Sequence, residues 1–159
     1  MLTAPAPGSE GYRWPAEWER HAATWMAWPH NAETWPGCFD GAVAAFVEIV
    51  RALSGCEPVR VLVADAAMED AARRRLAAAG VDTGSAVEFP HVPTDDTWLR
   101  DSGPVVLVRE GVAGCERVAV DFRFDAWGGK YPPWERDAAV PREIARLAEL
   151  PVRDAGFVL

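Results

Sequence analysis

The chain has 159 residues, of which 50% are hydrophobic and 25% are charged, as expected for one globular domain with a sizeable core. Its formal net charge of −8 argues against nucleic acid and against an anionic membrane as partners. The first eleven residues lack the charged and apolar regions of a signal peptide, and no apolar run is long enough to cross a bilayer. We therefore expect a cytoplasmic protein without a membrane partner.

The predicted elements alternate between strands and helices. Residues 1–11 are rich in proline and glycine and predict a disordered N-terminal arm, so the folded domain is expected over residues 12–159. In chain order, we expect a strand over 23–28, helices over 39–54 and 65–79 with a strand over 59–64 between them, strands over 86–92, 105–109 and 117–124, a helix capped by Asp137 and ended by Pro151, and a strand from residue 152. Hairpins mixed with crossover helices make an α/β chain.

Two helix starts carry an aspartate as a predicted N-cap. Asp65 directly precedes an alanine-rich run whose acidic residues come early and whose arginines come late, the order that the helix dipole favours. Asp137 is the corresponding candidate for the last helix, and Pro141 is then expected in its first turn, where a missing N–H is tolerated.

The densest group of charged and aromatic residues is the segment 95–104, Asp-Asp-Thr-Trp-Leu-Arg-Asp-Ser-Gly-Pro. Charged residues are rarely buried unless they are paired, and Gly-Pro is typical of a turn rather than a helix. Carboxylates accept hydrogen bonds from a cation, and an indole face attracts its charge. The segment therefore predicts a binding site for a flat, cationic ligand.

Individual residues of this segment have two interpretations each. Asp101 can hold a guanidinium through two parallel hydrogen bonds, or it can form an internal salt bridge with Arg100 or another arginine. Trp98 can stack on a flat cation, or it can fill the core. The composition does not decide between these alternatives.

A second candidate is the tripeptide Trp127-Gly128-Gly129. The two glycines allow positive φ or a close approach of the backbone to a ligand, and Trp127 would form a pocket wall. The alternative is a tight turn between a hairpin and a helix. Lys130, the only lysine of the chain, is expected to be solvated rather than to bind an anion.

No cofactor or metal is expected. The cysteines are odd in number and lack a C-x-x-C spacing, so we predict no disulfide framework and no zinc site; each is expected to be a small buried residue: Cys38, Cys56 and Cys115. The histidines lack a second ligand at metal spacing and are expected to be structural: His21, His30 and His91. Phosphate-binding and dinucleotide motifs are absent from the sequence.

Four motifs in order resemble one known family. They are residues 14–19 (Trp-Pro-Ala-Glu-Trp-Glu), 21–29 (His-Ala-Ala-Thr-Trp-Met-Ala-Trp-Pro), 95–104, and 121–131 (Asp-Phe-Arg-Phe-Asp-Ala-Trp-Gly-Gly-Lys-Tyr). Together they resemble the agmatine deiminase family, also called bacterial peptidylarginine-deiminase-type proteins. One departure is Asp125, where the family commonly carries asparagine.

The resemblance implies the pentein fold, a five-bladed α/β propeller, of which this chain would cover roughly the first two blades as the N-terminal part of a single catalytic domain. It also implies hydrolysis of a small cationic guanidine without a cofactor: agmatine and water give N-carbamoylputrescine and ammonia, on the route to putrescine. In the family, a cysteine attacks the guanidinium carbon and a histidine serves as general acid and base.

By the same resemblance, Asp101 is the catalytic, guanidinium-binding aspartate, and Trp98 and Trp127 are substrate-binding residues. The family's cysteine, histidine and later acidic residues have no match in this chain. A deiminase of peptidyl arginine and a truncated, non-catalytic guanidinium-binding module remain the alternatives. A homo-oligomer of the full-length protein is a further possibility that the resemblance leaves open.

Overall fold

The structure is a computed structural model that describes residues 6–112 and 114–158. Within these residues the elements are the strands β1 (Thr24–Ala27), β2 (Val59–Leu62), β3 (Val87–Glu88), β4 (Val105–Gly111), β5 (Gly114–Arg123) and β6 (Val152–Val158), the helices α1 (Phe39–Ser54), α2 (Ala66–Ala78), α3 (Leu99–Ser102) and α5 (Glu135–Leu147), the short turn α4 (Ala126–Gly129), and the 3₁₀ helices η1 (Pro7–Glu10) and η2 (Ala32–Thr34).

The strands form two separate three-stranded sheets. In the first sheet, β1, β2 and β3 run parallel in that order, and α1 and α2 are the crossover connections. In the second sheet, β4 and β5 form an antiparallel hairpin, and β6 returns through α5 to pair parallel with β5. Each sheet with its helices is thus one α/β unit of the chain.

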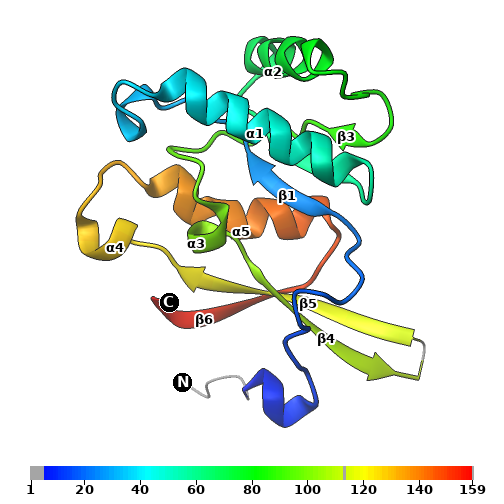
Figure 1. The fold of residues 1–159 in the computed structure, drawn as a ribbon. Coiled ribbons are helices and arrows are strands. Elements are labelled where there is room, and N and C mark those ends of the chain that lie inside the picture. Colours follow the sequence, from blue (N-terminus) through cyan, green and yellow to red (C-terminus); the bar gives the residue numbers. More distant parts are fainter. Residues whose placement is uncertain (1–5, 113, 159) are drawn as a thin grey trace.

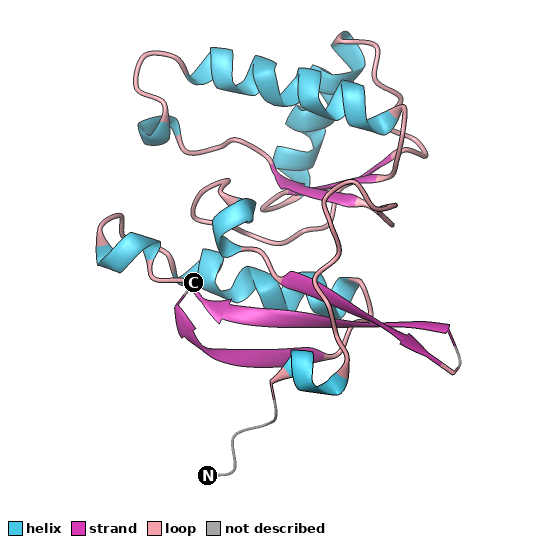
Figure 2. Ribbon diagram, turned by 60° about the horizontal axis from the view of Figure 1, so that its bottom comes forward, coloured by secondary structure: helices cyan, strands magenta, loops and turns pink. Residues whose placement is uncertain are grey.

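Figures 1 and 2 show the elements stacked in layers. Helices α1 and α2 cover one face of the first sheet, and α5 lies between that sheet and the β4–β5–β6 sheet, with the single turn α3 beside it. The end of β4 and the start of β5 extend beyond this stack in both views. The loops that precede α3 and follow β5 come together at the start of α5.

The first sheet is buried on both faces because helices lie on each side of it. One core, between the sheet and α1 and α2, contains alternate residues of β2 together with one face of each helix, among them Val50, Val59, Val61 and Leu76. The other core, between the sheet and α5, contains Ala27, Leu62, Val92, Val140 and Ile144. The neighbouring residues Val61 and Leu62 therefore belong to different cores, as the two-residue period of a strand requires.

Several local predictions are confirmed. Helix α1 has the predicted bounds, and its buried residues Val43, Val47 and Val50 follow the helical spacing of its apolar stripe. Asp65 is the N-cap of α2, since its side chain accepts a hydrogen bond from the backbone N–H of Met68. The strand predicted over 86–92 is much shorter, because only Val87 and Glu88 pair with β2 as a ladder.

The start of α5 differs from the prediction. Asp137 is not its N-cap: Trp134 holds that position, and Asp137 is the third residue of the helix. Its side chain points instead toward the backbone of the 95–96 segment. Pro141 consequently lies in the helix interior rather than in the first turn, and it is buried. A long-range partner, which local capping rules do not describe, decides the role of Asp137.

Part of the predicted N-terminal arm forms a short helix in the structure. Residues Pro7–Glu10 form η1, which lies against the second sheet. Arg109 of β4 donates a hydrogen bond to the carbonyl oxygen of Glu10 (3.0 Å), and Arg153 of β6 forms an ion pair with its carboxylate. Residues 1–5 lie outside the described residues.

Candidate functional site

The site lies in a groove of about 650 Å³ where three segments meet: the 31–34 turn, the start of the 95–104 segment and the 124–133 segment. Its lining contains four acidic side chains, Glu33, Asp95, Asp96 and Asp137, and one basic side chain, Lys130. Four aromatic rings complete the walls: Trp98, Phe124, Trp127 and Tyr131. An excess of carboxylates beside aromatic faces favours a cationic ligand.

The carboxylates of Asp95 and Asp96 are held by neighbouring groups. Asp96 accepts hydrogen bonds from the hydroxyl of Thr34 (2.5 Å) and from the backbone N–H of Thr97 (2.8 Å). Asp95 accepts from the backbone N–H of Arg136 (2.8 Å), at the start of α5. These contacts join η2, the site segment and α5 into one wall of the groove.

Asp137 completes this wall from the helix side. It is only 4% exposed and accepts hydrogen bonds from the backbone N–H groups of Asp95 (2.7 Å) and Asp96 (3.1 Å). Burial, with a smaller contribution from the nearby charges of Asp95 and Asp96, raises the pKa of Asp137 to about 6. The two backbone N–H groups oppose this shift because they stabilise the charged form.

Trp98 precedes α3 and belongs to an aromatic cluster that reaches α1. Its ring centroid lies 5.9 Å from that of Trp35, and Trp35 contacts Phe39 and Phe46 of α1. Trp98 remains 41% exposed. The ring is therefore supported from one side and accessible in the groove, so it is not a core residue.

Trp127 projects from a left-handed turn, labelled α4 in Figure 1. The φ angles of all four residues of this turn are positive: Ala126 (51°), Trp127 (58°), Gly128 (82°) and Gly129 (73°). L-residues other than glycine reach this region at a cost of roughly 1–2 kcal/mol each, and such strain concentrates at functional sites. Of the two possibilities considered for the glycines, positive φ is the one that the structure shows.

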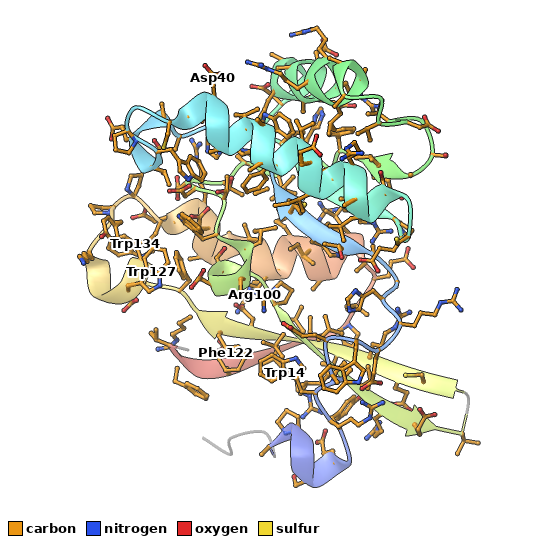
Figure 3. The ribbon with its side chains drawn as sticks, viewed as in Figure 1. Trp14, Asp40, Arg100, Phe122, Trp127 and Trp134 are labelled. Atoms are coloured by element: carbon orange, nitrogen blue, oxygen red, sulfur yellow. The ribbon has the colours of Figure 1, made fainter. Side chains whose placement is uncertain are left out.

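Contacts on both sides hold the turn and its tryptophan. The Asp125 carboxylate accepts a hydrogen bond from the N–H of Gly128 (2.8 Å), which caps the turn. The Trp127 ring makes edge contacts with Phe124 and Tyr131, yet is 50% exposed. Figure 3 shows Trp127 and Trp134 on the side of the molecule where α4 and the start of α5 lie. Asparagine could make the same bond through its side-chain oxygen, so the departure at Asp125 preserves this contact.

Asp101 lies outside the lining of the groove. It is the third residue of α3 and is exposed. Arg100 donates instead to Glu17 (2.7 Å), so the internal salt bridge between Arg100 and Asp101 does not form. Among residues 6–112 and 114–158, the Asp101 carboxylate makes no hydrogen bond or ion pair. It is therefore available to a ligand that approaches α3, and its guanidinium-binding role stays a prediction.

Gly103, which sequence reasoning treated only as part of a turn signal, closes α3 for a steric reason. Its N–H donates to the carbonyl oxygen of Leu99 (2.8 Å), and a Cβ atom at position 103 would lie 2.4 Å from that oxygen. Only glycine fits there without moving the backbone. The Gly-Pro pair thus ends a single helical turn that presents Trp98 and Asp101, although the prediction for this segment was a turn without helix.

A second hollow, of about 410 Å³, lies beside β5 and β6. Its charges are nearly balanced, because three aspartates face two arginines there, and Arg142 forms ion pairs with Asp121 (2.6 Å) and Asp154 (3.6 Å). No carboxylate excess comparable to that of the first groove remains there for a cation. The groove between α3, α4 and α5 is therefore the better candidate site.

No cysteine or histidine of the described residues lines this groove. The prediction that the cysteines are buried is wrong, because all three are exposed and free: Cys38, Cys56 and Cys115. The three histidines bind neighbouring acidic or backbone groups: His21, His30 and His91. Among the described residues, no group of three or more potential ligands could hold a metal ion.

Residues 13–159 match the model of the Porphyromonas-type peptidyl-arginine deiminase family. The chain belongs to this family. It is 38% identical over 160 residues to the agmatine deiminase of Ectopseudomonas mendocina, and the aligned region covers 96% of this chain and 40% of that protein. It is 39% identical over 145 residues to the agmatine deiminase of Pseudomonas aeruginosa strain LESB58, covering 89% of this chain and 37% of that protein.

The structure also resembles solved agmatine deiminases. That of Enterococcus faecalis superposes with a TM-score of 0.83 at 27% identity and covers 99% of this chain and 42% of the other. A putative agmatine deiminase gives the same TM-score at 30% identity. The predicted pentein fold is thereby confirmed, with the two sheets as parts of the propeller. The chain spans about 40% of the length of the relatives that it matches.

Across the described residues, no helix has the length and apolar character needed to cross a membrane.

Proposed function

We propose that this chain is the N-terminal part of a single pentein catalytic domain, residues 12–159, and that the whole protein hydrolyses agmatine and water to N-carbamoylputrescine and ammonia. The observation that carries the proposal is the groove: four acidic side chains and two half-exposed tryptophans line it, and two of its three segments belong to the motifs of a family whose relatives include agmatine deiminases. A cytoplasmic location and a place in putrescine formation belong to the same proposal.

The described residues supply binding rather than bond cleavage. An exposed indole attracts a flat cation, and carboxylates accept hydrogen bonds from guanidinium N–H groups. Trp98 and Trp127 provide the indoles, and Asp101 is the carboxylate proposed to hold the guanidinium and to keep its carbon open to attack. The cysteine nucleophile and the histidine acid–base of the proposed reaction would come from residues beyond this chain.

None of the three cysteines present can take the nucleophile's place, because none lines the groove: Cys38, Cys56 and Cys115. We therefore expect the 159-residue chain to release no ammonia from agmatine by itself. The full-length product of the gene is expected to do so, and its reading frame after residue 159 should encode a cysteine and a histidine. A full-length product without turnover of agmatine would refute the proposed activity, and turnover by the isolated chain would refute the assignment of the missing nucleophile.

Peptidyl arginine is the second candidate substrate, since the matching family model is described by that activity. A peptide brings a neutral backbone where agmatine brings a primary ammonium. Because the groove has an excess of carboxylates, it favours the additional positive charge of the agmatine ammonium over the neutral backbone of a peptide. We expect kcat/KM of the full-length enzyme to be higher for agmatine than for an N- and C-terminally blocked arginine peptide. A preference for the peptide would reverse the assignment.

A further inference from the structure

Helix α5 and the site segment are linked by two reciprocal sets of hydrogen bonds. The Asp95 side chain accepts from the N–H of Arg136, the second residue of α5 (2.8 Å). In return, the side chain of Asp137, the third residue, accepts from the N–H groups of Asp95 (2.7 Å) and Asp96 (3.1 Å). This pattern resembles a capping box, in which the cap and the third helical residue each accept from the other's backbone, except that the Asp95 side chain accepts from the second helical residue instead of the third.

The two halves of this capping box are far apart in the sequence. In an ordinary capping box, one residue three positions before the acidic residue supplies the cap. Here Trp134 holds the N-cap position and its side chain makes no capping bond. The missing acceptor comes from Asp95, 41 residues before Arg136. The interaction therefore stabilises the helix end and, at the same time, fixes the position of a distant loop.

The loop that is fixed carries the groove residues. Asp96, held by Asp137, is also bound by Thr34 of η2, and Trp98 follows two residues later. Asp101 lies on α3, the turn that this loop enters. Although Asp137 belongs to the groove lining, its carboxylate is buried and both of its oxygens accept hydrogen bonds from the loop backbone.

We propose that Asp137 is a positioning residue, which together with Asp95 clamps the 95–98 loop to the start of α5 and thereby sets where Trp98 and Asp101 stand relative to the groove. The catalytic part of this inference rests on the proposed function. The clamp itself consists of hydrogen bonds to the backbone N–H groups of Asp95 and Asp96, so it can be tested without any assay of activity.

The first test is hydrogen exchange on the full-length protein, followed in peptides that cover Asp95 and Asp96. Removing the acceptor by Asp137→Ala should accelerate exchange of these amides by roughly tenfold or more, because both lose their hydrogen-bond partner. Asp137→Asn keeps one acceptor oxygen and should accelerate amide exchange less than Asp137→Ala does. This milder variant keeps the test decisive if Asp137→Ala fails to fold. Asp95→Asn, which retains an acceptor for Arg136, should preserve protection at the start of α5, whereas Asp95→Ala should lose it.

A matched control separates positioning from simple loss of stability. Asp65→Ala removes an N-cap of the same chemistry from α2, outside the groove lining, at a similar expected cost in stability. It should leave exchange at Asp95 and Asp96 and the kcat/KM for agmatine unchanged. Asp137→Ala should lower kcat/KM by about tenfold or more, since small displacements of binding groups are costly to catalysis.

Unchanged exchange at Asp95 and Asp96 in Asp137→Ala would overturn the clamp. Equal losses of kcat/KM in Asp65→Ala and Asp137→Ala would reduce the effect of Asp137 to general stability and overturn its positioning role. If the wild-type protein shows no deiminase activity, the proposed function fails, but the exchange measurement still decides whether the clamp exists.

Discussion

Gly128 and Gly41 offer a pair of substitutions with opposite expected signs. At both positions a Cβ atom would have no neighbour within 4 Å, so neither substitution by alanine causes a steric clash. The difference lies in the backbone. Gly128 has φ of 82° in the left-handed turn that carries Trp127, whereas Gly41 lies inside helix α1.

The magnitudes follow from this difference. An L-residue in the left-handed region costs roughly 1–2 kcal/mol, and the reduced freedom of the unfolded chain returns only part of that, so Gly128→Ala should destabilise by ~1 kcal/mol. Gly41→Ala should stabilise by ~0.5–1 kcal/mol, because alanine is the better residue in a helix. For a chain of this size, each kcal/mol moves the melting temperature by roughly 2–4 °C.

Urea unfolding followed by circular dichroism would measure both variants against the parent protein. Gly128→Ala should lower the midpoint and Gly41→Ala should raise it, with the same slope in all three proteins. A midpoint for Gly128→Ala equal to or above that of the parent would show that the turn is not held in the left-handed conformation. The strain proposed for the turn that carries Trp127 would then be absent.

Three further predictions concern the site. Burial raises the pKa of Asp137 from 3.8 to about 6, so this group stabilises the fold fully below pH 3.8 and loses that contribution as the pH rises through 6. The loss amounts to at most ~3 kcal/mol. Between about pH 4 and about pH 7, the urea midpoint of Asp137→Asn should therefore depend less on pH than that of the parent protein. Gly103→Ala should destabilise by ~2 kcal/mol or more in the same assay, because its Cβ would collide with the Leu99 carbonyl oxygen; a smaller loss would mean that α3 yields easily. In the full-length enzyme, Asp101→Asn should lower kcat for agmatine by roughly 10²-fold or more while the melting temperature stays near that of the parent, since the side chain is exposed; unchanged kinetics would remove Asp101 from the guanidinium site.

Features that depend on neighbours in sequence were predictable. The bounds of α1 follow from the spacing of its apolar residues, and the Asp65 cap follows from a side chain that reaches an N–H three residues away. The positive φ of Gly128 and Gly129 was one of the two possibilities that their residue type suggested. For the site, the 95–104 segment and Trp127 could be chosen because charged and aromatic residues beside glycine are hard to explain by packing.

Features that depend on distant partners were not predictable. The cysteines are exposed although their residue type favours burial. Arg100, one of the partners considered for Asp101, pairs instead with Glu17, 83 residues away. The left-handed conformation of Ala126 and Trp127 also lacks a local signal, because these residue types disfavour it.

By itself, the sequence determined the order of strands and helices, the family motifs and the residue types that favour a cation, because these depend on spacing and side-chain chemistry. Only the tertiary structure decided that Trp98 and Trp127 line one groove, that Asp101 stands outside its lining, and that Asp137 serves the 95–98 loop rather than its own helix alone. The physical reason is that a buried carboxylate must find hydrogen-bond donors wherever the fold provides them, and for Asp137 these donors lie 41 and 42 residues away in the chain.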